Sequence, residues 1–288
     1  MKWINSNDDQ SNVEDRRGRV SRGAKIGGIG TIIAIALYFF TGQDFSSVIN
    51  MFTESGGQQQ GQEVIDQAKA GENEELKVFS VRVFNSCNDV WDKLLPTQAE
   101  IQYRDPKFVV FTDATQSDCG GANEAMGPFY CPADEKVYID LNFFHELNTK
   151  FHASGDLAMA YVIAHEVGHH VQKVLGITDK IDQLRGRVSE KEFNKYSVRL
   201  ELQADFLAGI WANYAQKMDI IKLEEGDIES ALGAANAVGD DNIMKQTQGY
   251  VVPDAFTHGS SEQRMRWFMK GFKTGDINQG DTFSVTSL

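Results

Sequence analysis

Three residues within one short stretch have the types and spacing of a catalytic metal site. The stretch is His-Glu-Val-Gly-His at 165–169. Residues four apart on an α-helix point the same way, so the imidazoles of His165 and His169 can bind one ion. Glu166 lies next to the first imidazole, where its carboxylate can take a proton from a water on the metal. The pattern therefore predicts a zinc site on a helix.

A second pair of side chains with helical spacing follows downstream, formed by Glu201 and Asp205. A catalytic zinc ion takes three protein ligands and keeps one position open for water, so Glu201 is the candidate third ligand. Asp205, one turn further, is expected to accept the outer N–H of a ligand histidine without binding the ion itself. The five-residue motif alone also arises by chance on exposed helices, and the added pair favours one Zn²⁺ per chain.

The surrounding patterns predict the two helices that hold these residues. The first is expected from about residue 156 to 176, with an apolar stripe facing the core. The second is expected from about 189 to 218 and opens with a capping box of Ser189 and Glu192. His170 is turned about 100° around the first helix from its neighbouring ligand, so we expect it to be an outer or surface group.

The chain from residue 77 onward predicts an α+β fold that is mostly helical, with a small antiparallel sheet. A short apolar run predicts a strand at 108–111. Turn-forming residues at 132–135 and alternating apolar residues at 137–141 predict a hairpin over 127–141. Two further helices are expected at 227–238 and 260–272. The sequence contains no phosphate-binding loop and no nucleophile elbow, so only the metal constellation carries chemistry.

Composition and charge limit the class of partner. A chain of 288 residues that is 41% hydrophobic has the composition of an ordinary globular protein with one sizeable domain. Its formal net charge of -13 argues against nucleic acid as a partner. Nucleic-acid binding depends on lysine and arginine contacts to phosphates, and this chain is acidic.

The N-terminal region predicts a membrane anchor. Basic residues between positions 16 and 25 precede an uncharged run at 26–42. Such a run predicts one transmembrane helix whose N-terminus stays in the cytoplasm. The apolar core of a secretory signal is the alternative, but no small-residue cleavage site follows the run.

This anchor divides the chain into four predicted parts. Residues 1–25 are expected to be a disordered cytoplasmic arm, and 26–42 the anchor. The Gly- and Gln-rich stretch at 43–76 is expected to be a flexible linker. Residues 77–288 then form the catalytic domain on the far side of the membrane.

The three cysteines fit a compartment outside the cytoplasm. Cys119 and Cys131 flank a short Gly-containing segment and could close a loop by disulfide, which leaves Cys87 unpaired. The alternative is three small buried apolar side chains.

Long segments of the chain resemble the bacterial neutral zinc metallopeptidases of the YpfJ type. They are Asn-Val-Glu-Asp-Arg-Arg-Gly at 12–18, Ala-Met-Gly-Pro-Phe-Tyr-Cys-Pro-Ala-Asp at 125–134, and residues 160–170 and 256–264. The likeness covers nearly the whole chain. It implies a zinc metallopeptidase domain at 77–288, held at a bacterial inner membrane and exposed to the periplasm or the cell exterior.

The order of the motifs is also similar to that of the wider glutamate-zincin group, whose last element corresponds here to Thr257, His258 and Arg264. That likeness implies a zincin fold, in which an edge strand beside the motif helix binds extended peptide, and residues 137–141 are the matching segment. It also implies that His258 donates a hydrogen bond to the oxyanion formed at the scissile carbonyl. A surface histidine in a Gly-Ser turn is the alternative. Gly259 stands where the distant group has proline.

Together these features predict a membrane-anchored zinc endopeptidase that acts on peptides or unfolded proteins, with Glu166 as the general base. Two alternatives stay open. One is a zinc-stabilised, membrane-tethered binding or assembly module without turnover. The other is a helical scaffold without any ion, in which His165 and Glu201 pair in the core.

Overall fold

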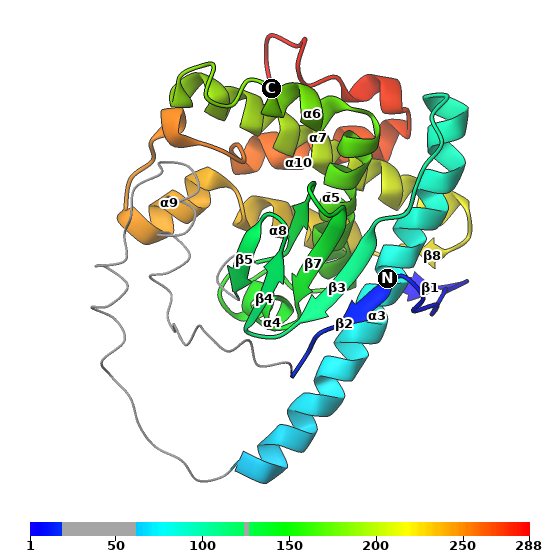
Figure 1. Cartoon of the computed structure of the whole chain (residues 1–288). Helices are drawn as coiled ribbons and strands as arrows, with labels where there is room; N and C mark the ends of the chain where they lie inside the picture. Colours follow the sequence, from blue (N-terminus) through cyan, green and yellow to red (C-terminus); the bar gives the residue numbers. More distant parts are fainter. Residues whose placement is uncertain (19–61, 124–126) are drawn as a thin grey trace.

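Helix α5 (Asp156–Val174), which carries the His-Glu-Val-Gly-His motif, runs through the interior of the structure (Figure 1). The computed structural model describes residues 1–18, 62–123 and 127–288. Most side chains of α5 are buried, and Gly176, in the left-handed conformation, follows the helix. The predicted helix at 156–176 is therefore confirmed to within two residues.

Helix α7 (Glu190–Lys217) packs against α5 and carries the second pair of carboxylates. The hydroxyl of Ser189 accepts the backbone N–H of Glu192, which caps the helix where the sequence predicts its start. The two helices approach closely at Gly168, where a Cβ atom would lie 3.1 Å from the carbonyl oxygen of Ala204. The glycine inside the motif thus lets α5 and α7 come near enough to share one site.

Helix α10 (Ser261–Thr274) lies on the other side of α7 and begins with the predicted capping box of Ser260 and Gln263. At Gly271 a Cβ atom would lie only 1.9 Å from the carbonyl oxygen of Phe206, so no larger residue fits there. This close approach seats α10 against the middle of α7, where Arg264 of α10 reaches Asp205.

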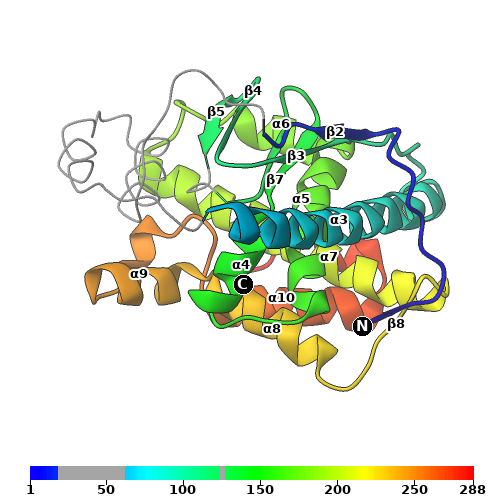
Figure 2. The ribbon, with the colours of Figure 1, turned by 90° about the horizontal axis from the view of Figure 1, so that it is seen from below.

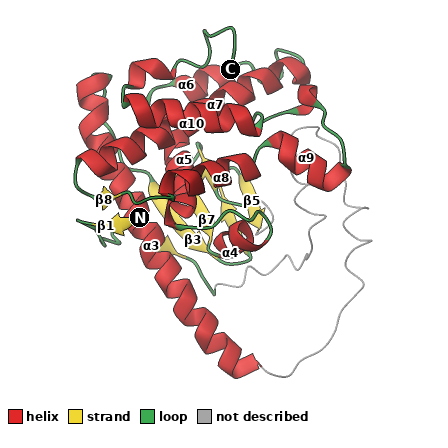
Figure 3. Ribbon diagram, turned by 180° about the vertical axis from the view of Figure 1, so that it is seen from behind, coloured by secondary structure: helices red, strands yellow, loops and turns green. Residues whose placement is uncertain are grey.

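The main sheet has four strands in the order β2-β3-β7-β6. They are β2 (Val13–Asp15), β3 (Lys107–Phe111), β7 (Lys136–Asp140) and β6 (Phe129–Cys131). Helix α5 packs against β6 and β7 of this sheet and lies in front of it in the view from behind (Figure 3). The sheet is mixed: β2, β3 and β7 run parallel to one another, and only β6 is antiparallel. The α+β class is confirmed, but the prediction of an all-antiparallel sheet is wrong because two long crossovers join β2 to β3 and β3 to β7.

The remaining elements surround this core. Helix α3 is the longest and lies along one side of the molecule, with the strands of the sheet above it in the view from below (Figure 2). The elements outside the core have these bounds: α3 (Gln62–Gln98), β4 (Ala114–Ser117), β5 (Gly120–Asn123), α4 (Asn142–Thr149), α6 (Ile177–Asp182), α8 (Asp227–Ala237), α9 (Asp240–Gln248), η2 (Pro253–Ala255) and η3 (Ile277–Gly280).

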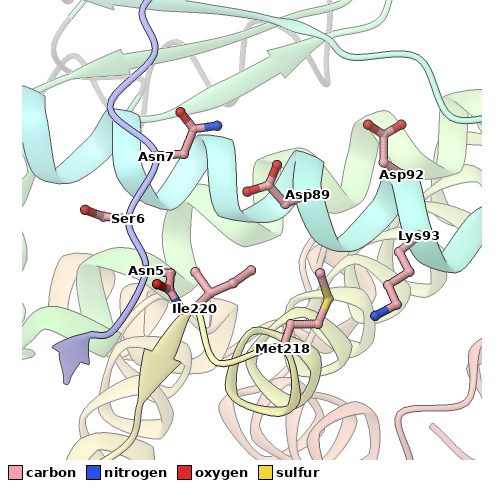
Figure 4. A pocket seen from close by; sticks show the side chains of 8 residues that line it. All are labelled: Asn5, Ser6, Asn7, Asp89, Asp92, Lys93, Met218 and Ile220. Carbon is pink, nitrogen blue, oxygen red and sulfur yellow. The ribbon is translucent and has the colours of Figure 1, made fainter.

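The first eighteen residues are an ordered part of this fold, so the predicted disordered arm is wrong for them. Strand β1 (Lys2–Trp3) pairs with β8 (Ile221–Lys222), and β2 pairs with β3. Between these strands, the guanidinium of Arg82 on α3 donates to both carboxylate oxygens of Asp8 at 2.5 and 2.8 Å. A pocket separates part of this segment from α3 (Figure 4) and is lined by Asn5, Ser6, Asn7, Asp89, Asp92, Lys93, Met218 and Ile220.

The predicted single-pass topology is also wrong, because β2, which precedes the predicted span, pairs in one sheet with β3, which follows it. A single crossing between residues 18 and 62 would place β2 and β3 on opposite sides of a membrane, and their backbone pairing excludes that arrangement. The predicted flexible linker ends earlier than residue 76, since α3 already begins at Gln62. The predicted span at 26–42 lies outside the described residues, and none of the helices within the described ranges is long and apolar enough to cross a membrane.

Candidate metal centre

The two imidazoles of the motif and the carboxylate of Glu201 converge as the sequence predicts. The Nε2 atom of His165 lies 3.1 Å from Oε2 of Glu201, and Nε2 of His169 lies 3.4 Å from Oε1. One ligand atom from each residue falls within 4.8 Å of the other two. Two imidazole nitrogens and one carboxylate are the donor set of a catalytic zinc site.

Asp205 holds the outer nitrogen of His165. Its carboxylate is fully buried and accepts the Nδ1–H of His165 at 2.8 Å and the hydroxyl of Tyr161 at 2.5 Å. Arg264 donates to the same carboxylate through Nε at 2.9 Å and Nη2 at 3.0 Å. Asp205 thus keeps a proton on Nδ1, so Nε2 is the nitrogen of His165 that faces Glu201 and is available to an ion. Asp205 thus lies behind the ligand, as predicted.

Electrostatics at this point favour a cation. Burial works to lower the pKa of His165, but Asp205 and then Glu201 outweigh it and raise that pKa to about 10. Burial works to raise the pKa of Asp205, and Arg264 followed by His165 lowers it instead. A proton or a metal ion at the imidazole is therefore strongly stabilised by the carboxylates around it.

Tyr161 and Gln172 are two functional neighbours that the sequence did not identify. Gln172 is fully buried, and its Oε1 lies 2.9 Å from Nδ1 of His169. Tyr161 lies four residues before His165 and Gln172 lies three residues after His169, so each shares a helix face with a ligand. This helical spacing is the sequence signal that could have identified both residues as neighbours of the ligands.

Glu166 is buried beside the ligands. Burial raises the pKa of its carboxyl, with His169 and His165 acting in the opposite direction. A carboxyl group with a raised pKa is suited to take and return a proton near neutral pH. It follows His165 directly on α5, and its role as general base stays a prediction.

His258 is held by Asp240, which begins α9. One carboxylate oxygen of Asp240, Oδ2, accepts the backbone N–H groups of Thr257, His258 and Gly259 at 2.7, 2.7 and 3.0 Å. The other oxygen accepts the Nδ1–H of His258 at 3.1 Å. Burial works to lower the pKa of His258, but Glu201 and Asp240 raise it. Asp240 thus fixes the imidazole through Nδ1, and the charges of Glu201 and Asp240 favour its protonated form.

Gly259 explains why this loop departs from the proline of the distant group. Its φ is +93°, a backbone conformation that proline cannot adopt. A Cβ atom there would also lie 3.2 Å from Gln263 Oε1 and from Leu202 Cδ2. The positive φ turns the chain so that three successive N–H groups reach one carboxylate.

Residues 137–141, which were predicted to form an edge strand that binds peptide, do not lie at the edge of the sheet. Residues 137–141 belong mostly to β7, which has β3 on one side and β6 on the other. Within the described residues β6 is the strand at that edge, and it is antiparallel to its neighbour. The hairpin pattern predicted both strands but could not give their order in the sheet.

His170 links β6 to the motif helix and is buried rather than at the surface. Its Nε2 lies 2.6 Å from the carbonyl oxygen of Arg104, which can only accept, so Nε2 carries the proton. Its Nδ1 then accepts the hydroxyl of Tyr130 on β6 at 2.9 Å. Burial lowers the pKa of His170 to about 4, so the ring is neutral at physiological pH. This histidine therefore positions the edge strand.

The predicted disulfide is present. Cys119, at the tip of the β4–β5 hairpin, is bonded to Cys131 at the end of β6, and the two Cα atoms are 5.8 Å apart. Cys87 is free and buried. The bond ties the edge strand to the neighbouring hairpin.

Comparison with known proteins identifies the family. A family model described as "Putative neutral zinc metallopeptidase" matches residues 1–283. The chain belongs to this family. It is 40% identical over 294 residues to "Uncharacterized protein YpfJ" of Escherichia coli strain K12, covering 98% of this chain and 99% of that protein. It is 43% identical over 214 residues to "Uncharacterized protein Mb2605" of Mycobacterium bovis, covering 71% of this chain and 69% of that protein. No solved structure matches the chain.

The family description implies zinc, and the residues present fit that ion. The donor set is the nitrogen and oxygen combination that zinc takes in catalytic sites. The outer nitrogens of both imidazoles already have partners, Asp205 and Gln172, which leaves the two Nε2 atoms for the metal. His165, His169 and Glu201 would therefore hold the ion.

Proposed function

We propose that this protein is a zinc-dependent endopeptidase, with His165, His169 and Glu201 as ligands and Glu166 as general base. The observation that carries the proposal is the convergence of two Nε2 atoms on the Glu201 carboxylate, 3.1 and 3.4 Å away. When bound there, zinc lowers the pKa of a water molecule and polarises a carbonyl group.

The chain's own residues then divide the work of hydrolysis. Glu166 accepts a proton from the attacking water as oxygen adds to the scissile carbonyl carbon. The Nε2–H of His258, held by Asp240, donates to the oxyanion that develops. Glu166 returns its proton to the leaving amine as the C–N bond breaks, so it ends in its starting state.

An extended peptide or unfolded protein is the proposed substrate, and β6 is its proposed binding strand. A strand with one free edge binds extended chains by backbone hydrogen bonds. Tyr130 and its hydrogen bond to His170 fix this edge against α5, and the disulfide at Cys131 fixes its end. Substrate pairing at β6 would place a scissile bond beside the motif helix.

Substitution of Glu166 by Gln tests the proposed function most directly, because the amide cannot accept the proton. Glu166→Gln should retain one zinc per chain and lose nearly all hydrolysis of casein, whereas His165→Ala should lose zinc and hydrolysis together. Parental casein cleavage by the Gln variant would exclude Glu166 as the base. A parent protein that binds zinc but shows no chelator-sensitive cleavage would instead favour a binding or assembly module.

We further propose that the folded body, including residues 1–18, works in an oxidising compartment outside the cytoplasm. The support is the disulfide between Cys119 and Cys131, since such bonds persist mainly in oxidising environments. A membrane anchor at 26–42 stays a prediction, and it must leave residues 1–18 on the same side as the metal centre. Blocking free thiols in intact cells and then counting the cysteines released by reductant tests the compartment, with two released thiols expected.

A further inference from the structure

The two ligand histidines have outer partners of different kinds. Nδ1 of His165 faces a carboxylate, whereas Nδ1 of His169 faces the neutral side-chain amide of Gln172, 2.9 Å away. An amide offers an oxygen that accepts and a nitrogen that donates, so its orientation decides which nitrogen of His169 carries the proton. If the oxygen faces His169, the lone pair lies on Nε2 and is available to a metal.

A backbone carbonyl fixes the orientation of Gln172. The other atom of its amide lies 2.7 Å from the carbonyl oxygen of Leu200 on α7. A carbonyl oxygen only accepts, so this atom must be Nε2, and Oε1 must face His169. His169 therefore donates from Nδ1 and presents Nε2 to the site.

A second glutamine extends this chain of hydrogen bonds to the C-terminal segment, residues 275–288, which follows α10. Nε2 of Gln172 also donates to Oε1 of Gln203 at 3.1 Å, and Nε2 of Gln203 donates to the carbonyl oxygen of Gly280 at 2.8 Å. The Gly280 carbonyl fixes the second amide as the Leu200 carbonyl fixes the first. Gly280 packs so tightly on Phe206 that a Cβ atom there would lie 2.4 Å from its ring, so the carbonyl is held in place.

The C-terminal segment is itself bound to α7 around the third ligand. The hydroxyl of Thr282 donates to the carbonyl oxygen of Arg199 at 2.6 Å, and Nη1 of Arg199 donates to the carbonyl oxygen of Val285 at 3.2 Å. Arg199 and Gln203 lie two residues before and two residues after Glu201. The same segment therefore contacts the helix that supplies Glu201 and the amide chain that reaches His169.

We propose that Gln172 and Gln203 are positioning residues that fix the Nδ1–H tautomer of His169, and that the C-terminal segment holds them through Gly280. This inference rests on the proposed zinc function. A neutral partner suits His169 because Glu166, Glu201 and Asp205 already bring three carboxylates into the buried site, where a further unpaired charge is costly. The amide fixes the tautomer without adding charge.

Equilibrium zinc affinity, measured by competition with a chelator, tests the proposal without relying on activity. Gln172→Met keeps the size of the side chain but removes the acceptor, and should weaken zinc binding about 10–100-fold, the usual effect of losing such a partner. Gln203→Met should weaken it in the same direction but less. Gln172→Glu restores an acceptor and should bind zinc more tightly than Gln172→Met, whereas a purely structural role predicts that the buried charge makes Glu the worse substitution.

Gln98 provides the matched control. Its Nε2 donates to the carbonyl oxygen of Gly275 at 3.1 Å and its Oε1 accepts the N–H of Ile277 at 2.8 Å, just after α10. It bonds neither to the ligands nor to Gly280, Thr282 and Val285, which Gln203 and Arg199 hold directly. Gln98→Met should leave zinc affinity within about twofold of the parent.

The outcomes separate this inference from the proposed function. Zinc binding by Gln172→Met within twofold of the parent, or a loss in Gln98→Met equal to that in Gln172→Met, would overturn the positioning role. A parent protein that binds no zinc would overturn both proposals, whereas one that binds zinc without hydrolysing peptides would overturn only the proposed turnover. If Gln172→Met does not fold, the ordering of Gln172→Glu and Gln203→Met against Gln98→Met decides.

Discussion

Replacing Arg264 by Met should strongly destabilise the protein. Arg264 donates two hydrogen bonds, at 2.9 and 3.0 Å, to a carboxylate that is fully buried. Met keeps much of the volume but removes the charge. Asp205 then remains buried with Tyr161 and His165 as its partners, and the loss of Arg264 removes the group that most lowers its pKa.

The expected cost follows from the burial of this pair. Removing one partner of a buried, hydrogen-bonded ion pair costs about 3–5 kcal/mol, because the other charge is left without compensation. The lower end applies to the metal-free protein, where protonated His165 can offset part of the charge. For a chain of this size each kcal/mol lowers the melting temperature by about 2–4 °C, so Arg264→Met should melt roughly 6–20 °C below the parent.

Urea unfolding of the metal-free protein in EDTA, together with thermal unfolding, measures this effect. Arg266 on the same helix is exposed and provides the control, since Arg266→Met should change the free energy of unfolding by no more than about 0.5 kcal/mol. Asp205→Asn combined with Arg264→Met should cost less than the sum of the single changes, because the two side chains interact directly. If Arg264→Met unfolded at the same urea concentration as Arg266→Met, the buried pair would not stabilise the site as argued.

Three further changes have defined outcomes. The pKa of His165 is raised from 6.5 to about 10, so its contribution to metal-free stability is fully present below pH 6.5 and is lost as pH rises toward 10. Zinc must displace that proton, and its affinity should rise about tenfold per pH unit between pH 7 and 9; an affinity independent of pH would contradict this. Gly259→Ala should lower the free energy of unfolding by about 1–2 kcal/mol, because only glycine readily adopts its φ of +93°. Gly259→Pro should lower it further. Equal stability of the parent and both variants would show that the loop does not need this conformation. Single cysteines introduced at the exposed Gln10 and Ser287 should react equally with an impermeant maleimide in intact cells, and labelling of only one of them would restore the single-pass topology.

The grouping of the candidate metal ligands could be predicted from the sequence because helical spacing is a local property. His165 and His169, like Glu201 and Asp205, are one turn apart, and the cap at Ser189 fixed the start of the second helix. Local rules therefore placed each pair on its helix face. Bringing the pairs together also requires the close approach at Gly168, for which the sequence offered only the absence of a side chain.

The N-terminal strand could not be predicted by the same reasoning. Val13–Asp15 is three residues long and lies in a polar, charged stretch, which has the composition of a disordered arm. It is ordered by β3, which follows more than ninety residues later in the sequence, and by Lys77 of α3, whose Nζ lies 3.0 Å from the Asp15 carboxylate. Strand order in the sheet likewise depends on long crossovers, so the hairpin pattern at 127–141 could not show that β6, and not β7, lies at the edge.

The charges around the site explain why a zinc ion there would act on a carbonyl group. Asp205 and Arg264 offset each other, so the carboxylate left to balance the ion among the ligands is that of Glu201. Zinc held by two neutral imidazoles and one carboxylate keeps a net positive charge, and burial strengthens its field. Glu166 lies beside the ligand His165, and burial raises the pKa of its carboxyl. The proposed oxyanion donor is His258, which Asp240 holds through Nδ1. A further buried carboxylate at position 172 would add negative charge to a site that already holds Glu166 and Glu201, which is the physical reason to expect an amide there.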